Sequence, residues 1–341
     1  MISTIPVRRA PALGVGLAVL LALLGAVAFL SVTQGARDIG LAEVLRALGG
    51  LGVNEEITGT VTLELRVPRT LLGILAGAAL GAAGAILQGV TRNPLADAGI
   101  MGINAGAAVF VVFAITVLGI QGVGVYVWFA FAGAIIATLL VYTIASLGRE
   151  GATPVKLALA GAAVTAGLTS VTTGVLMTNI DALNELRFWQ VGALAGRYMP
   201  ILTGVAPFLI AGLVVALGLG RALNGLALGE DVARGLGQRV GLTRTVAFGV
   251  VAVLAGAATA ACGPIVFIGL VVPHLARALC GPDYRWTLPY SMLLAPIVLL
   301  LADVLGRIAG APGELQVGVV LGVLGAPIFV LIVRYGRMSE V

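Results

Sequence analysis

Residues 77–88 read GAALGAAGAILQ, and residues 256–267, at an offset of 179 positions, read GAATAACGPIVF. Neither stretch contains a charged side chain, and each lies in a longer apolar run. The same register continues without gaps and pairs Pro94 with Pro273, followed by a further pair of glycines. Prolines and glycines held in one register indicate an internal duplication, for which chance similarity between small residues is the alternative.

The composition around these stretches is that of a membrane protein. Hydrophobic residues make up 60% of the 341 residues and charged residues 10%, whereas an average globular domain is about 25% charged. A mean hydropathy of +1.11 is too high for a soluble core of this size. The 49 glycines favour helices that pack closely through small residues. We therefore expect an all-α polytopic membrane protein that forms one transmembrane domain over residues 1–341.

Ten apolar stretches are candidates for membrane helices, since a helix needs roughly 20 apolar residues to cross the bilayer. The eighth is too short to cross alone and follows a Gly-Pro pair, which indicates a broken or re-entrant segment packed inside protein. The stretches are 11–33, 67–90, 98–118, 122–147, 154–178, 199–220, 243–262, 264–277, 287–308 and 315–334.

The duplication divides these stretches into two repeat units, residues 67–178 and residues 243–334. The second to fifth stretches would correspond to the seventh to tenth. A separation of five spans is odd, so the second unit would cross the membrane in the opposite sense. Inverted repeats of this kind are characteristic of transporters, whose substrate path lies at the repeat interface.

Loop charges predict the orientation. With the N-terminus inside, 13 Lys and Arg residues fall on the inner side and 7 on the outer side, as the positive-inside rule requires. We therefore expect a multi-pass protein of the cytoplasmic membrane with both termini cytoplasmic.

Few side chains are available for catalysis or cofactor binding. The chain has one histidine (His274), one lysine (Lys156) and two cysteines without metal-ligand spacing, and it lacks a phosphate-binding GxxxxGK[ST] loop. The basic residues are scattered in short loops, which argues against nucleic acid despite a pI near 9.7. We expect no enzyme activity, no bound metal and no cofactor on this chain.

Energy for transport would then come from elsewhere. Ion-coupled carriers usually hold acids within the bilayer, and Asp303, beside Arg307, is the main acid inside a predicted span. A transporter driven by a separate motor is the better interpretation, and an ion-coupled secondary transporter is the alternative.

Two regions have the composition of partner surfaces. The longest inner segment, residues 221–244, places a polar face beside apolar residues at near-helical spacing. A solvated loop helix is the alternative. On the outer side, where the positive-inside rule predicts few basic residues, three arginines lie at helix ends: Arg66, Arg69 and Arg307. Basic residues in this position suggest an acidic partner. Interfacial snorkelling of the arginines is the alternative there.

Several long motifs, in order along nearly the whole chain, resemble the FecCD-type permease family of ABC importers for ferric siderophores, haem and cobalamin. Within that family the chain looks most like permeases for ferric catecholate siderophores. The motifs are RVPRT (66–70), GAALGAAGAILQGVTRNPLAD (77–97), GINAGA (102–107), ALGEDVARGLG (227–237), GPIVFIGLVVPHLAR (263–277), LLLADVLGR (299–307) and GELQVGVVLGVLGAP (313–327).

The resemblance implies an iron–siderophore importer whose partners are a second permease subunit, identical or homologous, two cytoplasmic ATPases that bind ATP, and an extracytoplasmic binding protein. Haem and cobalamin are alternative substrates. Arg66, Arg69 and Arg307 match residues that dock the binding protein. The residues matching the ATPase-coupling segment are Leu228, Gly229, Glu230, Asp231, Arg234 and Gly237. The span at 154–178 would line the path, with Thr153, Pro154 and Val155 at the inner gate and Thr165 and Thr169 along it.

His274 belongs to the family's PH-x-x-R segment beside the predicted break. One histidine without carboxylate or thiolate neighbours is a poor iron site. We expect His274 to satisfy a free backbone group there, and the siderophore to carry the iron.

Overall fold

The computed structural model describes residues 10–35, 39–50, 59–120, 122–147 and 153–335, and every regular element within these ranges is a helix. Seven of these helices are long and apolar enough to cross a membrane, and three shorter apolar helices accompany them. These ten helices correspond to the ten apolar stretches, so the predicted all-α membrane fold is confirmed.

The elements are α1 (Ala10–Thr33), α2 (Leu41–Leu48), η1 (Val61–Arg66), α4 (Val67–Thr91), η2 (Ala98–Met101), α5 (Ile103–Thr116), α6 (Val123–Ser146), α7 (Pro154–Leu176), α8 (Ile180–Gln190), α9 (Met199–Gly218), α10 (Gly220–Ala227), α11 (Glu230–Gly235), α12 (Val240–Cys262), α13 (Ile268–Cys280), α14 (Tyr284–Ala309) and α15 (Val317–Tyr335).

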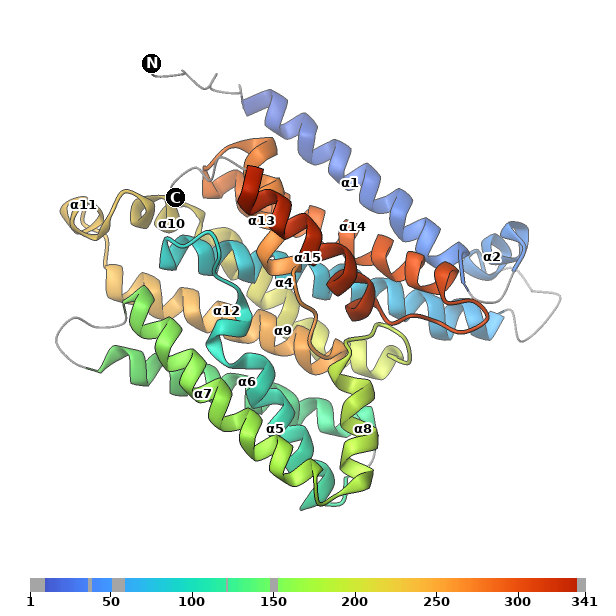
Figure 1. Ribbon diagram of the computed structural model, residues 1–341. Helices are drawn as coiled ribbons and strands as arrows, with labels where there is room; N and C mark the ends of the chain where they lie inside the picture. The colour runs from blue at the N-terminus through green and yellow to red at the C-terminus, as the bar shows by residue number, and fades with distance from the viewer. Residues whose placement is uncertain (1–9, 36–38, 51–58, 121, 148–152, 336–341) are drawn as a thin grey trace.

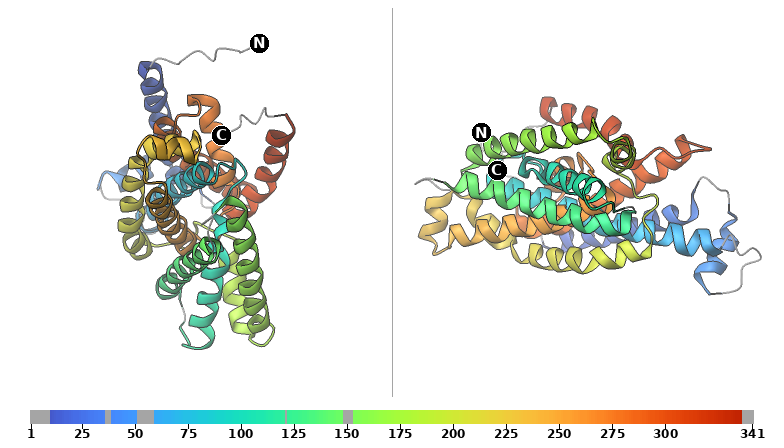
Figure 2. Two further views of the ribbon diagram at one scale, coloured as in Figure 1. Left: turned by 90° about the vertical axis from the view of Figure 1, so that its left-hand side faces the viewer. Right: turned by 90° about the horizontal axis from the view of Figure 1, so that it is seen from below.

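Helices α4 and α12 form the centre of the bundle, and α4 packs against α14, α12, α13 and α9 (Figure 1). Helix α1 runs along one edge against α14, while α7 lies at the opposite edge with α5 and α6 (Figures 1 and 2). The central helices are largely buried by protein and the edge helices are not. An apolar helix exposed in this way must be covered by lipid or by another chain.

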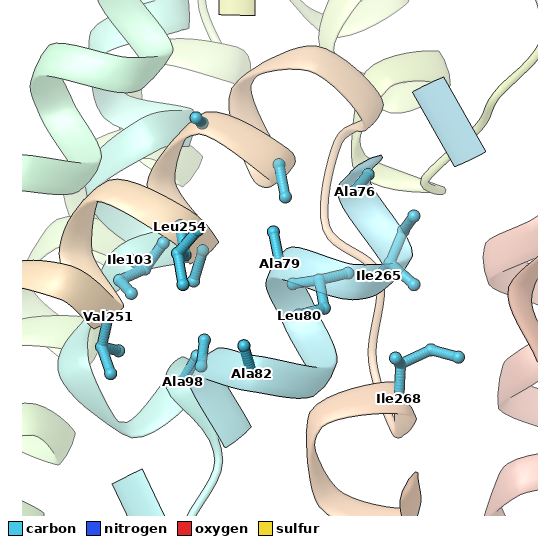
Figure 3. Close-up of a cluster of buried hydrophobic side chains, with 14 of the residues drawn as sticks. Ala76, Ala79, Leu80, Ala82, Ala98, Ile103, Val251, Leu254, Ile265 and Ile268 are labelled. Atoms are coloured by element: carbon cyan, nitrogen blue, oxygen red, sulfur yellow. The ribbon is translucent and has the colours of Figure 1, made fainter. Parts of the chain in front are cut away.

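Small residues allow α4 to take this central position. A Cβ at Gly77 would lie 2.6 Å from the Cα of Pro296 on α14, so only glycine permits this helix contact. Further along α4, a Cβ at Gly84 would clash with the carbonyl group of Gly269. Figure 3 shows alanines of α4 facing Val251 and Leu254 of α12. Close backbone approach of this kind is how helices associate where lipid gives no hydrophobic driving force.

The short eighth stretch is preceded by a break, as its sequence predicts. Residues 263–267 are not helical, and α13 begins only at Ile268. The break is covered by protein: the amide of Ala193 donates to the carbonyl of Cys262 at 2.7 Å, and Gln88 Nε2 donates to Gly269 O at 3.2 Å. Backbone carbonyls around the break therefore have hydrogen-bond partners, as the interior of a membrane protein requires.

The third stretch is also broken. The described backbone forms the short helix η2, passes through Gly102 with φ of +71°, and continues as α5. The two predicted repeat units do not break at matching positions, because α12 ends at Cys262 whereas α4 stays helical past the corresponding Ala83 to Thr91. The duplication therefore stays a prediction.

Two of the described α-helices lie outside both the ten predicted stretches and the predicted segment 221–244. Helix α2 packs on η1, and α8 connects α7 to the loop that precedes α9. The second span is also longer than expected, because η1 extends it back to Val61. Both additional helices are too short and too polar to cross a bilayer, which is why a search for long apolar runs misses them.

Candidate functional site

Helices α2 and α11 lie at opposite ends of the bundle (Figure 1), here called the α2 end and the α11 end. The residues proposed from the sequence as partner surfaces divide between them. Arg66, Arg69 and Arg307, here called the arginine cluster, lie at the α2 end, where η1 leads into α4 and α14 approaches its last turn. The coupling segment includes α11 itself.

Two members of the arginine cluster, Arg69 and Arg307, share one carboxylate, Asp303 of α14. Arg69 Nε donates to Asp303 Oδ2 at 2.9 Å and its Nη2 donates to Oδ1 at 2.8 Å, which makes the pair bidentate. Arg307, one helical turn on, donates to Asp303 Oδ2 at 2.9 Å. Arg69 Nη1 also donates to Glu314 at 2.7 Å. Bidentate, charge-assisted hydrogen bonds are among the strongest that side chains form.

Other donors of the cluster bind the end of α1. Arg307 Nη1 donates to the carbonyl oxygens of Ser31 and Gln34 at 2.8 and 2.6 Å. Arg66 Nη1 donates to the carbonyl oxygens of Val32 and Thr33 at 3.1 and 2.8 Å. The last carbonyls of a helix have no partner within that helix, and cations near them are favourable. The two arginines therefore cap α1.

In this arrangement protein encloses most of the charge of the arginine cluster. Arg66 is 5% exposed and Arg307 is 1% exposed, so neither presents its charge to solvent in this conformation. Arg69 is somewhat more accessible, and its partner Glu314 is about one-third exposed on its side chain. Snorkelling does not describe the cluster either, because its guanidinium groups bind protein. A docking role for the cluster stays a prediction.

At the α11 end, Gly229 and Gly237 bound the short helix α11 with φ of +103° and +80°, values that favour glycine. Leu228 and Leu236 are 63% and 71% exposed, and Val232 between them is half exposed. The helix therefore presents an apolar strip outward. Such a strip at the end of a bundle is typical of a protein contact.

Charged residues line the same helix. Arg234 donates to Glu230 at 2.9 Å and to Asp231 at 3.3 Å, while the Asp231 side chain is fully exposed. Glu230 also pairs with Arg244 on α12. Exposed pairs contribute little stability, so the polar face is free to rearrange on contact with a partner.

Two polar contacts fasten the coupling segment to the membrane helices. The Glu230–Arg244 pair joins α11 to α12. Asn224 of α10 donates to Asp283 at 2.6 Å and accepts from the amide of Tyr284 at 2.8 Å, which joins α10 to the start of α14. These contacts connect the coupling segment to α12 and α14, both of which pack against α4.

Helix α7 carries the residues expected to line a path. Thr153 caps its first turn by accepting from the amide of Lys156 at 3.4 Å, and Pro154 occupies the first helical position. Val155 and Thr169 are exposed, whereas Thr165 is half buried near Gly102. The structure leaves most of α7 uncovered, and its assignment to a path or gate stays a prediction.

His274 satisfies a backbone carbonyl, as expected from its sequence context. Its Nε2 lies 2.9 Å from Pro94 O, and Arg277 Nη2 lies 3.1 Å from its Nδ1. Arginine can only donate, so Nδ1 accepts and Nε2 carries the proton donated to Pro94. Arg277 also donates to Gln88 Oε1 at 2.6 Å. These contacts attach α13 to the end of α4 and the following loop.

Asp97, in that loop, is a half-buried acid between two membrane helices. Burial raises the pKa of its carboxyl above the ordinary value, although hydrogen bonds from the Gly99 and Ala98 amides work in the opposite direction. Among the described residues, Asp97 forms no ion pair. The same residues contain no group of three or more His, Cys, Asp or Glu side chains placed to hold a metal ion.

Comparison with known proteins gives consistent results. The profile of the FecCD transport family matches residues 21–335. The ferric enterobactin transport system permease of Escherichia coli K12 is 46% identical over 306 residues, which cover 89% of this chain and 90% of that protein. The Fe(3+)-citrate import system permease of Bacillus subtilis 168 is 40% identical, over 90% and 91% of the two chains. A solved inward-facing structure of a metal-chelate type ABC transporter superposes with a TM-score of 0.79 at 25% identity, over 93% of this chain and 98% of that one.

Proposed function

The chain belongs to the FecCD transport family, and from this premise we propose that it is the membrane-spanning subunit of an ATP-driven importer for a ferric siderophore. One observation carries the proposal. The similarity to permeases for iron complexes extends over nearly the full length of both chains, through the membrane helices and through α11. The chain is a transport subunit, and in this proposal ATP hydrolysis takes place on a partner protein.

The apolar strip on α11 supports an ATPase as that partner. Leu228, Val232 and Leu236 are exposed in this chain and would be buried in a groove of the ATPase. Closure of the ATPase pair around ATP would displace α11. The contacts with α12 and α14 would carry the displacement to the centre of the bundle, and so switch access to the path from one side to the other.

The exposed face of α7 supports a second permease subunit. Leu159 and Val171 are among its exposed apolar side chains, and small residues separate them. Two copies, or this chain and a homologue, would enclose a path between their α7 helices, with Thr165 and Thr169 along it and Thr153–Val155 near one end. The extracytoplasmic binding protein would deliver the siderophore at the α2 end.

Membrane placement follows in the same proposal. The chain would lie in the cytoplasmic membrane with the α11 end and both termini on the cytoplasmic side. Ion coupling is less favoured, because Asp303, the acid that such a mechanism would use, is held by two arginines. Guanidinium donors of Arg69 and Arg307 occupy both oxygens of this carboxylate, so a coupling ion would have to displace them.

The test is uptake by the reconstituted transporter. Proteoliposomes containing this chain, its ATPase and its binding protein are loaded with ATP and supplied with radiolabelled ferric enterobactin, ferric citrate, haem or cobalamin. We expect accumulation of an iron–siderophore complex that a hydrolysis-defective ATPase abolishes and a protonophore leaves intact. Accumulation driven by an ion gradient without ATP would overturn the proposal. Preference for haem or cobalamin would overturn the assignment of a ferric siderophore as the substrate.

A further inference from the structure

A cavity of about 330 Å³ lies at the α2 end, beside the arginine cluster. It is bounded by η1, the start of α4, the end of α14 and the loop between α8 and α9. Four of its lining residues are arginines and one is a glutamate. The lining residues are Gly35, Val61, Leu65, Arg66, Arg69, Ala195, Gly196, Arg197, Tyr198, Arg307 and Glu314.

Arg197 differs from the other three arginines. Arg69 and Arg307 share Asp303, and Arg66 caps α1. Arg197 is only 7% exposed, yet it forms no ion pair with a described residue. Its side chain interacts with the Tyr126 hydroxyl, but its Nε has no hydrogen-bond partner. A buried cation without a counter-ion is strongly unfavourable, and a buried N–H without an acceptor adds to the cost.

The surroundings of Arg197 favour an anion. Helix α9 begins at Met199, directly after Tyr198 of the cavity wall, so the positive end of its dipole lies next to the cavity. Beside the cavity, Leu65 of η1 is exposed and provides an apolar surface. Arginine donors in a fixed fork match the oxygens of a phosphate, and an apolar wall next to them matches an acyl chain.

We propose that this cavity is a binding site for a phosphate group and that Arg197 is its principal ligand. The phosphate is either free in solution or the headgroup of an anionic phospholipid such as phosphatidylglycerol. When bound, the group supplies the counter-ion of Arg197 and joins the α8–α9 loop to the arginine cluster. The cavity shares Arg66, Arg69 and Arg307 with the docking prediction, but the phosphate proposal rests on Arg197, which that prediction does not include.

The experiment uses the full-length chain in nanodiscs and has two arms. In the first, phosphatidylcholine nanodiscs are titrated with sodium phosphate at ionic strength held constant with chloride, and the unfolding midpoint is followed. In the second, nanodiscs contain a graded fraction of phosphatidylglycerol, and retained lipid is counted by native mass spectrometry. We expect saturable stabilisation or lipid retention in one arm, weakened at least tenfold in apparent affinity by Arg197→Gln and less by Arg197→Lys.

Two further variants keep the test decisive. Arg187→Gln removes an exposed arginine of α8 that stacks on Phe188, and binding should not change. Val61→Phe keeps all four arginines and fills part of the cavity, so binding should fall as much as it does for Arg197→Gln. Val61→Phe therefore still tests the proposal if Arg197→Gln folds poorly. Equal binding by the wild type, Arg197→Gln and Val61→Phe in both arms would overturn the proposal. Protection of the cavity only by an acidic protein partner would also overturn it.

Discussion

Arg69 and Asp303 are 234 residues apart in sequence and form a bidentate ion pair between two helices, with donor–acceptor distances of 2.8 and 2.9 Å. The pair joins the start of α4 to the end of α14, and Arg307 shares the same carboxylate. With both partners largely buried, the pair depends on complete satisfaction of its charges. The charges of Arg69 and Arg307 are therefore both balanced by the carboxylate of Asp303.

Replacing Asp303 by Asn should strongly destabilise the chain. Arg307 would lose its acid, and Arg69 would retain only Glu314. Loss of one partner from a buried pair typically costs about 3–5 kcal/mol. Thermal unfolding in detergent measures the effect. Glu314→Gln is the control, because Glu314 is partly exposed and its pair should contribute about 0–1 kcal/mol. Equal midpoints for the two variants would contradict the central role of Asp303.

The same Glu314→Gln variant should speed docking of an acidic binding protein at low salt. It removes a negative charge at the α2 end and frees one donor nitrogen of Arg69, the most accessible member of the arginine cluster. We expect the association rate to rise a few-fold at low salt and to return to the wild-type value at high salt. Reversing all three arginines would not be a clean test, because two of them are buried. An unchanged rate at low salt would argue against docking through Arg69.

Leu228→Asp combined with Val232→Asp should detach the ATPase. Both side chains are largely exposed, so the chain itself should keep its unfolding midpoint. Two carboxylates in the proposed contact would have to be buried without partners, and at least a tenfold loss of ATPase affinity is expected. Copurification measures it, with Leu45→Asp on α2, at the opposite end, as the matched control. ATPase recovered in normal amount with the double variant would contradict the assignment of α11.

Asp97→Asn should change how stability depends on pH. Burial raises the pKa of Asp97 above its ordinary value of 3.8, so the folded chain disfavours the charged form. The contribution of Asp97 to the free energy of unfolding is fully present below pH 3.8 and is lost as pH rises through the folded-state pKa. The variant should therefore match the wild type in acid and become the more stable of the two toward neutral pH. Unfolding midpoints across this range test it, and parallel curves would contradict it.

Apolar runs were sufficient to predict the membrane helices, because the bilayer demands length and hydrophobicity from each segment by itself. The break before α13 was also predictable, since the Gly-Pro pair at Gly263 and Pro264 interrupts any helix. Helices α2 and α8 were not, because their stability comes from packing against neighbours, such as Val44 of α2 and Leu186 of α8, both fully buried.

The chemistry of the arginine cluster was only partly predictable. Asp303 and Arg307 are four residues apart on one helix, a spacing that indicates a pair, and the pair is present. The acceptors from Ser31 and Gln34 lie more than 270 residues away in sequence. No sequence pattern around Arg197 marks this residue, because its importance depends on a cavity to which η1, α4 and α14 contribute. Burial of a charge is a property of the assembled bundle.

The capping of α1 by Arg66 and Arg307 has a consequence for the order of assembly during synthesis. Arg66 is made soon after α1 and can reach the carbonyls of Val32 and Thr33 early. The carbonyls of Ser31 and Gln34 receive their donor only when the ribosome has passed Arg307. Until then the end of α1 lacks the contacts that Arg307 and the rest of α14 make with it in the folded chain. The last carbonyls of α1 thus receive their full set of donors only after α14 has been synthesised.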